Sequence, residues 1–255
     1  MQASKNIKKP DYGNWVSKKL IYVPAVLAAV FITLAFFSQL FLIVALAFLI
    51  ITAYFAYAYY EFSPAGGDIQ TRIRAFVLDN LAWDGRGEAI DIGCGNGALA
   101  IKLAQRYPPA LIKGIDYWAG NWGYSKQACE RNAEYEGVAD RSHFQHASAA
   151  ALPFADGHFD AAISNFVFHE VHDAKNKRDV VREALRVVRK GGSFAFQDLF
   201  PNRAIYGDID SLLEEIRSWG IEEVSFINTS NAPFIPGLLK LPFMVGAIGI
   251  ICGKK

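Results

Sequence analysis

A glycine-rich turn contains the residues whose types and spacing best suit ligand chemistry. It reads Asp91-Ile92-Gly93-Cys94-Gly95-Asn96-Gly97, follows the apolar run Glu88-Ala89-Ile90 and leads into a helical pattern from Ala98. Glycines let a ligand approach the backbone closely, and the first turn of a helix offers free N–H groups. A strand, a tight turn and a helix in this order predict a nucleotide-binding site.

Two carboxylates narrow the choice of ligand. The third glycine comes one position earlier than in the dinucleotide fingerprint G-x-G-x-x-G, and Asp91 stands two residues before the first glycine. A carboxylate there repels a pyrophosphate but suits an ammonium group. The next expected strand, 111–116, ends at Asp116, where an acid in this architecture binds ribose hydroxyls.

These residues, with the turn Leu152-Pro153-Phe154 and the strand start Phe159-Asp160, resemble class I S-adenosylmethionine-dependent methyltransferases. Within that class, the chain is similar to the broad group that includes the quinone-biosynthesis methyltransferases. The run 185–192, ending in Gly191-Gly192, resembles that group's helix-to-strand turn before the fifth strand. The resemblance covers about Gly66 to Lys255 and implies S-adenosylmethionine as the cofactor.

The alternation of apolar strands and helical patterns predicts an α/β fold, a doubly wound Rossmann-like sheet that is mostly parallel. The resemblance implies seven strands with an antiparallel last strand. We expect strands near 88–92, 111–116, 142–146, 159–165, 193–199, 222–228 and 246–252. We expect helices near 68–82, 97–106, 123–136, 175–189 and 208–218.

The resemblance also implies which residues contact the cofactor. Asp91 and the turn would hold its methionine end, Asp116 its ribose, and Tyr117 and Trp118 its adenine. Ser148 and Ala149 stand where the family often has an aspartate, and Ser148 can still accept a hydrogen bond. The full set is Asp91, Gly93, Cys94, Gly95, Asn96, Gly97, Asp116, Tyr117, Trp118, Ser148, Ala149 and Asn165. Cys94 is expected to be a small filler, because no base stands beside it.

Two residues are candidates for catalysis. His169 follows the fourth expected strand and titrates near neutral pH, which suits a base; alternatively it caps or packs beneath the site. Asp198 ends the fifth expected strand and would orient the substrate, or form a turn. Asn165-Phe166-Val167-Phe168 differs from the Asn-Pro-Pro-Tyr common in enzymes that methylate nucleobases or glutamine. With a net charge of +1, this predicts no nucleic-acid partner.

The residues from Leu20 to Tyr60 include no charged side chain. At ~1.5 Å per helical residue this run covers about 60 Å, twice a bilayer core of about 30 Å. We therefore expect two transmembrane helices, about 20–37 and 40–60, within a segment 20–61 that joins a basic tail 1–19 to a domain 62–255. A hairpin buried in a soluble protein is the alternative. The lysines before the first span predict that both tail and domain are cytoplasmic.

The sequence thus predicts a membrane-anchored methyltransferase that acts on a small, lipophilic acceptor. Two other classes stay open: a non-catalytic membrane scaffold that binds the cofactor, and a nicotinamide-dependent oxidoreductase. The apolar stretch Phe234–Val245 either packs on the sheet edge or enters the membrane interface. The three cysteines, Cys94, Cys129 and Cys252, lack metal-ligand spacing, so no metal is expected.

Overall fold

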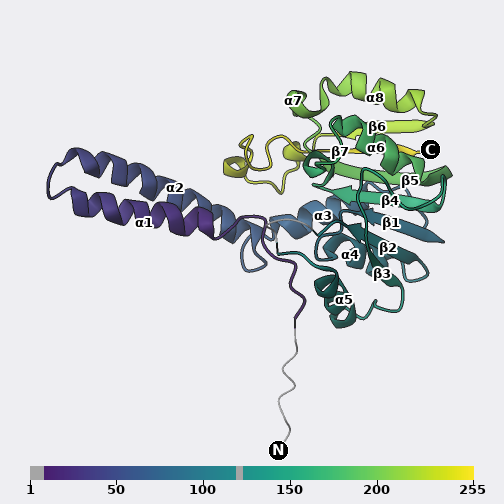
Figure 1. The fold of residues 1–255 in the computed structure, drawn as a ribbon, viewed down its shortest axis with the longest axis horizontal. Coiled ribbons are helices and arrows are strands. Elements are labelled where there is room, and N and C mark those ends of the chain that lie inside the picture. The colour runs from purple at the N-terminus through teal and green to yellow at the C-terminus, as the bar shows by residue number, and fades with distance from the viewer. Residues whose placement is uncertain (1–8, 119–122) are drawn as a thin grey trace, which may run out of the picture. The chain divides into compact units, whose positions relative to one another are not determined.

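A computed structural model describes residues 9–118 and 123–255, which divide into two compact units (Figure 1). Among the described residues, the sheet unit contains 9–12, 74–118 and 123–255, and the hairpin unit is Gly13–Ile73. These boundaries differ from the expected segments 1–19, 20–61 and 62–255. Residues Lys9 to Tyr12 group with the sheet, whereas the residues up to Ile73 group with the apolar helices.

Within the described residues, seven strands form one sheet in the order β3-β2-β1-β4-β5-β7-β6. Strands β1 to β5 pair in parallel, and β7 runs antiparallel to both of its neighbours. The predicted mostly parallel sheet with an antiparallel last strand is therefore confirmed. The strands are β1 (Glu88–Ile92), β2 (Leu111–Asp116), β3 (Ser142–His146), β4 (Phe159–Asn165), β5 (Val188–Asp198), β6 (Glu223–Ile227) and β7 (Gly249–Lys254).

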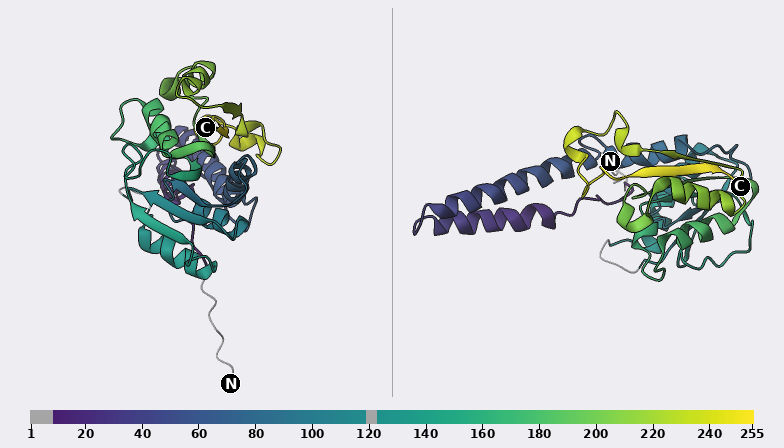
Figure 2. Two further views of the ribbon diagram at one scale, coloured as in Figure 1. Left: turned by 90° about the vertical axis from the view of Figure 1, so that its right-hand side faces the viewer. Right: turned by 90° about the horizontal axis from the view of Figure 1, so that it is seen from above.

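Helices cover both faces of this sheet (Figures 1 and 2). On one face, α6 (Lys177–Arg186), α7 (Arg203–Tyr206) and α8 (Ile209–Ser218) contribute to a core with Phe194 and Phe196 of β5. On the other face, α3 (Ile69–Asp79), α4 (Ala98–Arg106) and α5 (Lys126–Tyr135) contribute to a second core. Strand β1 is buried on both faces, and its residues Ala89, Ile90 and Ile92 are apolar, which is why the strand can be predicted from its sequence.

Capping residues fix where several helices start. Ser125, Asn176 and Asp208 each accept a hydrogen bond from a backbone N–H in the first turn of the next helix. Helices α5 and α6 therefore start at Lys126 and Lys177, slightly later than their hydrophobic patterns predict. Short 3-10 turns follow β4 (η1, Phe168–Glu170) and β6 (η2, Thr229–Asn231, and η3, Gly237–Leu239).

The interpretation of Gly191-Gly192 as the end of a helix is wrong. Helix α6 ends at Arg186, and both glycines lie inside β5. The pairing of β4 with β5 shifts register at this place, because Phe159 is opposite Val188 whereas Ala161 is opposite Ser193. The extra residues form a bulge, and Gly191 adopts a φ of 74° there.

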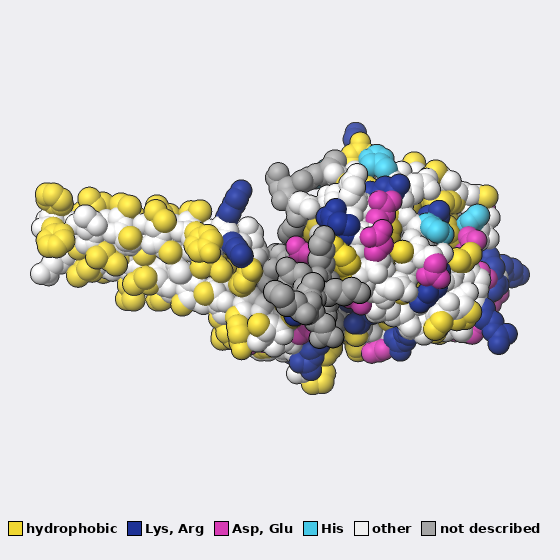
Figure 3. Space-filling model, turned by 90° about the horizontal axis from the view of Figure 1, so that it is seen from below, with side chains coloured by type: hydrophobic (Ala, Val, Ile, Leu, Met, Phe, Trp, Pro, Cys, Tyr) yellow, Lys and Arg dark blue, Asp and Glu magenta, His cyan; other side chains and the backbone are white. Residues whose placement is uncertain are grey.

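The hairpin unit contains two apolar helices, α1 (Lys19–Leu34) and α2 (Leu40–Phe62). They lie side by side, with the ring of Phe31 5.7 Å from that of Phe48 and small buried residues such as Ala28 and Ala45 on the two helices. Most of their other apolar side chains face outward, as the yellow side chains in Figure 3 show.

One helix among the described residues, α2, is long and apolar enough to cross a membrane. Its 23 residues have a mean hydropathy of 2.5 over the best window, of which only 6% is buried. Such exposure argues against the core of a soluble protein. Helix α1, with 16 residues, is shorter than a typical span, so the two expected spans are not established by helix length.

Candidate functional site

Asp91 lies in the centre of the sheet and is almost completely buried. It is 1% exposed, and β1 pairs with β2 and β4 on either side of it. Among the described residues, neither carboxylate oxygen accepts a hydrogen bond. Burial raises the pKa of Asp91 to about 7, against the opposing influence of the Ala100 N–H. A buried carboxylate without a partner suits a cationic ligand group.

The glycine turn after β1 brings backbone close to this carboxylate. Gly93 has a φ of 76°, and a Cβ on it would lie 2.1 Å from Cγ2 of Val167. Only glycine fits there, because any side chain would push away the segment that follows β4. The turn ends at Gly97, with a φ of 82°, directly before α4. The turn therefore links the ends of β1 and β4 at one place.

Asp116, at the end of β2, shapes the same turn. Its carboxylate accepts hydrogen bonds from the Gly95 N–H at 2.8 Å and from the Trp118 N–H at 2.7 Å. The Trp118 indole N–H donates in turn to the Gly95 carbonyl, also at 2.8 Å. Each carboxylate oxygen keeps a second lone pair, which is available to a hydroxyl donor.

The other residues expected to contact the cofactor range from exposed to buried. The Tyr117 side chain is exposed, and its ring lies 4.9 Å from that of His146. The Ser148 hydroxyl donates to Asp173 at 3.0 Å, whereas Ala149 is buried in the core. Burial raises the pKa of the Cys94 thiol, which fits a filler rather than a nucleophile.

The structure brings the two catalytic candidates together. Nδ1 of His169, in η1, lies 2.7 Å from Oδ1 of Asp198 at the end of β5. Asp198 is fully buried, and its other oxygen accepts from the N–H groups of Val167 and Phe168. Burial lowers the pKa of His169, but the hydrogen bond and charge of Asp198 outweigh this effect and raise it overall. An imidazole held in this way by a carboxylate can act as a base.

Asn165 ends β4 within a hydrogen-bond chain that crosses the sheet. Its Oδ1 accepts from Nε2 of Gln197 at 2.6 Å, and Oε1 of Gln197 accepts from the Thr229 hydroxyl at 3.0 Å. Gln197 and Thr229 are fully buried. The next residue, Phe166, has a φ of 59°, which is uncommon for a bulky side chain and often marks a functional site.

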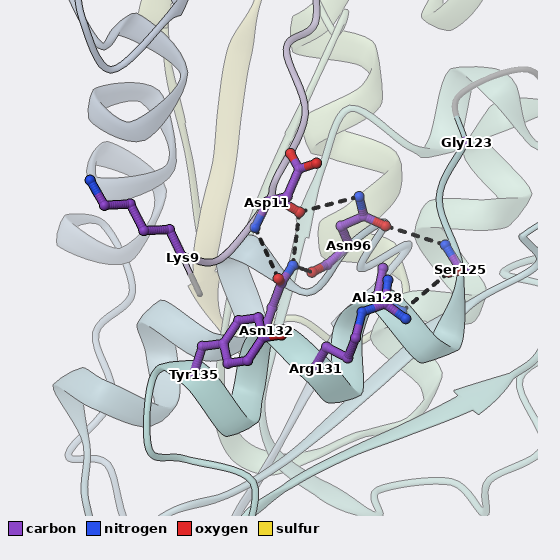
Figure 4. Close-up of a pocket in the computed structure, with 9 residues that line it drawn as sticks. All are labelled: Lys9, Asp11, Asn96, Gly123, Ser125, Ala128, Arg131, Asn132 and Tyr135. Carbon is purple, nitrogen blue, oxygen red and sulfur yellow. Dashed lines mark hydrogen bonds between the residues drawn. The ribbon is translucent and has the colours of Figure 1, made fainter. Parts of the chain in front are cut away.

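Sequence reasoning missed Asn132, which holds the N-terminal segment against the glycine turn (Figure 4). Its side chain accepts from the Asp11 N–H at 3.0 Å and donates to the carbonyls of Asp11 and Asn96. The Tyr12 hydroxyl donates a further hydrogen bond to the Glu136 carboxylate. A hollow of about 470 Å³ beside these residues is lined by Asn96 and Asn132, but not by Asp91 or Asp116.

Arg74 was also missed. It is only 7% exposed, and its positive charge partly offsets the burial that raises the pKa values of both Asp91 and Tyr124. The Tyr124 ring lies 3.3 Å from where a Cβ of Gly95 would be. The Arg74 guanidinium therefore acts electrostatically on the buried Asp91 carboxylate. No sequence motif in α3 predicts this role.

Comparison with known proteins finds similarity to methyltransferases. Residues 90–196 match the model of a family described as a methyltransferase domain. The chain is 33% identical over 143 residues to a malonyl-[acyl-carrier protein] O-methyltransferase of Geobacter sulfurreducens, covering 55% of this chain and 47% of that one. It is 32% identical over 136 residues to a demethylmenaquinone methyltransferase of Thermus thermophilus, covering 53% of this chain and 57% of that one. The chain thus spans about half the length of these curated relatives.

Solved structures share the fold at low sequence identity. A geranyl diphosphate methyltransferase in complex with SAM aligns with a TM-score of 0.53 and 16% identity, over 73% of this chain and 86% of that one. The [4+2]-cyclase SpnF aligns with a TM-score of 0.52 and 20% identity, over 72% and 78%. These likenesses establish the Rossmann-like α/β fold.

The charge of Asp91 should make stability depend on pH. Because its pKa is raised in the folded state, the stability it contributes is present below pH ~4 and lost as pH rises through 7. Between pH ~5 and ~8, the free energy of unfolding of the wild-type chain should fall by about 2–3 kcal/mol relative to that of Asp91→Asn. This follows from about 1.4 kcal/mol per pKa unit. Urea unfolding in detergent micelles, followed by tryptophan fluorescence, measures this difference.

The exposed carboxylate of Asp140 provides the matched control, because its side chain is 74% exposed. Asp140→Asn should leave the pH profile of the wild-type chain unchanged. Parallel profiles for the wild-type chain and Asp91→Asn would show that Asp91 ionises without a burial penalty.

Removing the Asn132 side chain should release the N-terminal segment. Asn132→Ala removes one hydrogen bond from the Asp11 N–H and one from each of the carbonyls of Asp11 and Asn96, at a cost of about 1–3 kcal/mol. Amide hydrogen exchange of the peptide around Asp11 should accelerate in this variant, while Glu134→Ala, at an exposed position on the same helix, should leave it unchanged. Equal exchange in both variants would mean that Asn132 does not hold the segment.

Proposed function

We propose that this chain is a membrane-anchored, S-adenosylmethionine-dependent methyltransferase that acts on a small, lipophilic acceptor. The observation that carries the proposal is the buried, unpartnered carboxylate of Asp91 next to a glycine turn. The methyltransferase-domain match over residues 90–196 and the SAM complex of a protein with this fold support the same cofactor.

The residues around the turn fit the parts of this cofactor. An α-amino acid carries an ammonium and a carboxylate, and Asp91 with Arg74 offers the complementary pair of charges. Gly93 leaves room for the approach of the methionine chain, and Asp116 keeps lone pairs for ribose hydroxyls. When bound, the cofactor supplies an activated methyl group on a sulfonium.

His169 is the proposed base. Methyl transfer needs an in-line nucleophile, and an acceptor that carries a proton must lose it. Asp198 holds the imidazole through Nδ1, which leaves Nε2 to take the proton from the acceptor. The segment that carries the base lies against the glycine turn, because a Cβ on Gly93 would lie 2.1 Å from Cγ2 of Val167, two residues before His169. A residue pair organised in this way favours catalysis over a purely scaffolding role.

The proposed anchor is the hairpin of α1 and α2. Helix α2 meets the length and hydropathy of a membrane span. Helix α1 comes closer to the required length when the apolar residues up to Phe37 are counted. Lys18 and Lys19 precede it, so the positive-inside rule places the sheet unit on the cytoplasmic side after two crossings. An enzyme fixed there meets acceptors that partition into the bilayer.

Transfer of labelled methyl groups tests this proposal. The full chain in lipid nanodiscs should bind S-adenosylmethionine and move tritium from it into the lipid-soluble fraction of a membrane extract. Asp91→Ala should weaken cofactor binding at least tenfold, about 1.4 kcal/mol, because the ammonium loses its counter-ion. Asp140→Asn should bind like the wild-type chain. Failure of the wild-type chain to bind the cofactor would refute the proposal.

The pH dependence of transfer tests the base. His169→Gln should lower kcat by on the order of 10²–10⁴ while leaving cofactor affinity unchanged. In the wild-type chain, transfer should increase as pH rises through a midpoint above the ordinary histidine pKa of about 6.5, because Asp198 raises it. Asp198→Asn should move that midpoint to lower pH.

His172 supplies the control for this series, since it is exposed and lies on the same segment. His172→Gln should keep both kcat and the midpoint. An unchanged profile in His169→Gln would assign the proton transfer to another group.

A further inference from the structure

The connection between β6 and β7 presents apolar side chains to the outside of the sheet unit. In this connection, residues 232–246, Leu238 is 63% exposed, Phe243 66% and Leu241 38%. Elsewhere in the described part of this unit, Leu111 is the one large aliphatic side chain with comparable exposure. Burying apolar surface is favourable, so such a concentration marks a contact surface.

These side chains are held outward by a folded segment. Leu239, Ile235 and Val245 are buried at 0%, 3% and 3% exposure. The Val245 N–H donates to the Leu239 carbonyl at 3.1 Å. The buried residues and this bond fix the turn, so the outward position of the apolar set is a property of the fold.

Topology places this connection at the edge of the sheet that holds the site. Strand β7 is antiparallel to both β5 and β6, so β6 points in the same direction as β5. The connection therefore leaves the sheet at the edge where β4 and β5 end. Thr229, three residues before it, ends the hydrogen-bond chain that begins at Asn165.

The connection also contacts the sequence that follows the apolar hairpin. The ring of Phe234 lies 5.8 Å from that of Phe76 in α3. Only a short stretch separates Phe76 from Phe62, the end of α2. At ~3.5 Å or less per residue, that stretch limits the separation of Phe76 from a membrane-embedded α2 to about 50 Å.

We propose that residues 232–246 form a second membrane contact, resting on the membrane anchoring proposed for the hairpin. Leu238, Leu241 and Phe243 enter the boundary between headgroups and acyl chains. Lys240, the sole charged residue of the connection, is exposed between them, and its ammonium reaches the lipid phosphates. A lipid surface accommodates both kinds of side chain. Because this edge holds the site, the contact would present the site to acceptors in the bilayer.

Lipid quenching of a fluorescent label tests the contact in the full chain. The three native cysteines are buried, so a cysteine introduced at an exposed position can be labelled selectively. Leu238→Cys and Phe243→Cys report on the connection, and Leu46→Cys reports on α2. Leu111→Cys is the matched control, an exposed leucine on another element. Each variant is reconstituted in phosphatidylcholine–phosphatidylglycerol vesicles that contain spin-labelled lipid.

Labels at positions 46, 238 and 243 should be quenched severalfold more than the label at 111. Quenching at 46 but not at 238 and 243 would overturn the second contact and leave the anchor intact. No quenching at 46 would instead refute the anchor. A label at 238 that is shielded in detergent, in proportion to protein concentration, would identify a second copy as the partner and overturn the lipid contact. Cofactor binding by each variant checks folding and tests the methyltransferase proposal separately.

Discussion

The carboxyl group of Asp91, buried without a geometric hydrogen-bond partner among the described residues, is the constraint on which the rest of the sheet unit depends. Its neighbours in β1, such as Ala89 and Ile92, are apolar and fully buried, as expected for a central parallel strand. A carboxylate among them costs folding energy, because burial outweighs the influence of the Ala100 N–H on it. Stability alone would favour an apolar residue here, which is why this carboxyl group supports the ligand site proposed above.

The parallel sheet then gathers the other polar groups at one edge. Asp116, Asn165 and Asp198 each end a strand, and parallel strands end together. Two of them form hydrogen bonds within the protein. Asp116 binds the glycine turn through the Gly95 N–H, and Asp198 orients His169. The same side chains thus order the backbone of the site and leave selected lone pairs or nitrogens for ligands. Such preorganisation limits the reorganisation needed when ligands bind.

Local sequence patterns were sufficient to predict the strands, the glycine turn and its two acids, because apolar periodicity and glycine positions reflect short-range geometry. The same reasoning identified His169 and Asp198 separately, but their contact depends on the pairing of β4 with β5. Asn132 could not be found, because it occupies an ordinary position in α5 and its partner Asp11 lies far away in the chain. The bulge at Gly191-Gly192 was missed for a related reason: glycine pairs are common to helix ends and to bulges.

The fold by itself does not determine the reaction, since its structural neighbours include a methyltransferase and a cyclase. Which reaction takes place therefore depends on groups outside the cofactor site. A base is useful only if the acceptor has a proton to lose, which favours hydroxyl or acidic carbon acceptors over neutral amines. The Phe166 ring lies 6.3 Å from that of His169 and disfavours a strongly charged acceptor there. For the function proposed above, an acceptor with an apolar body and one acidic hydrogen therefore fits these groups best.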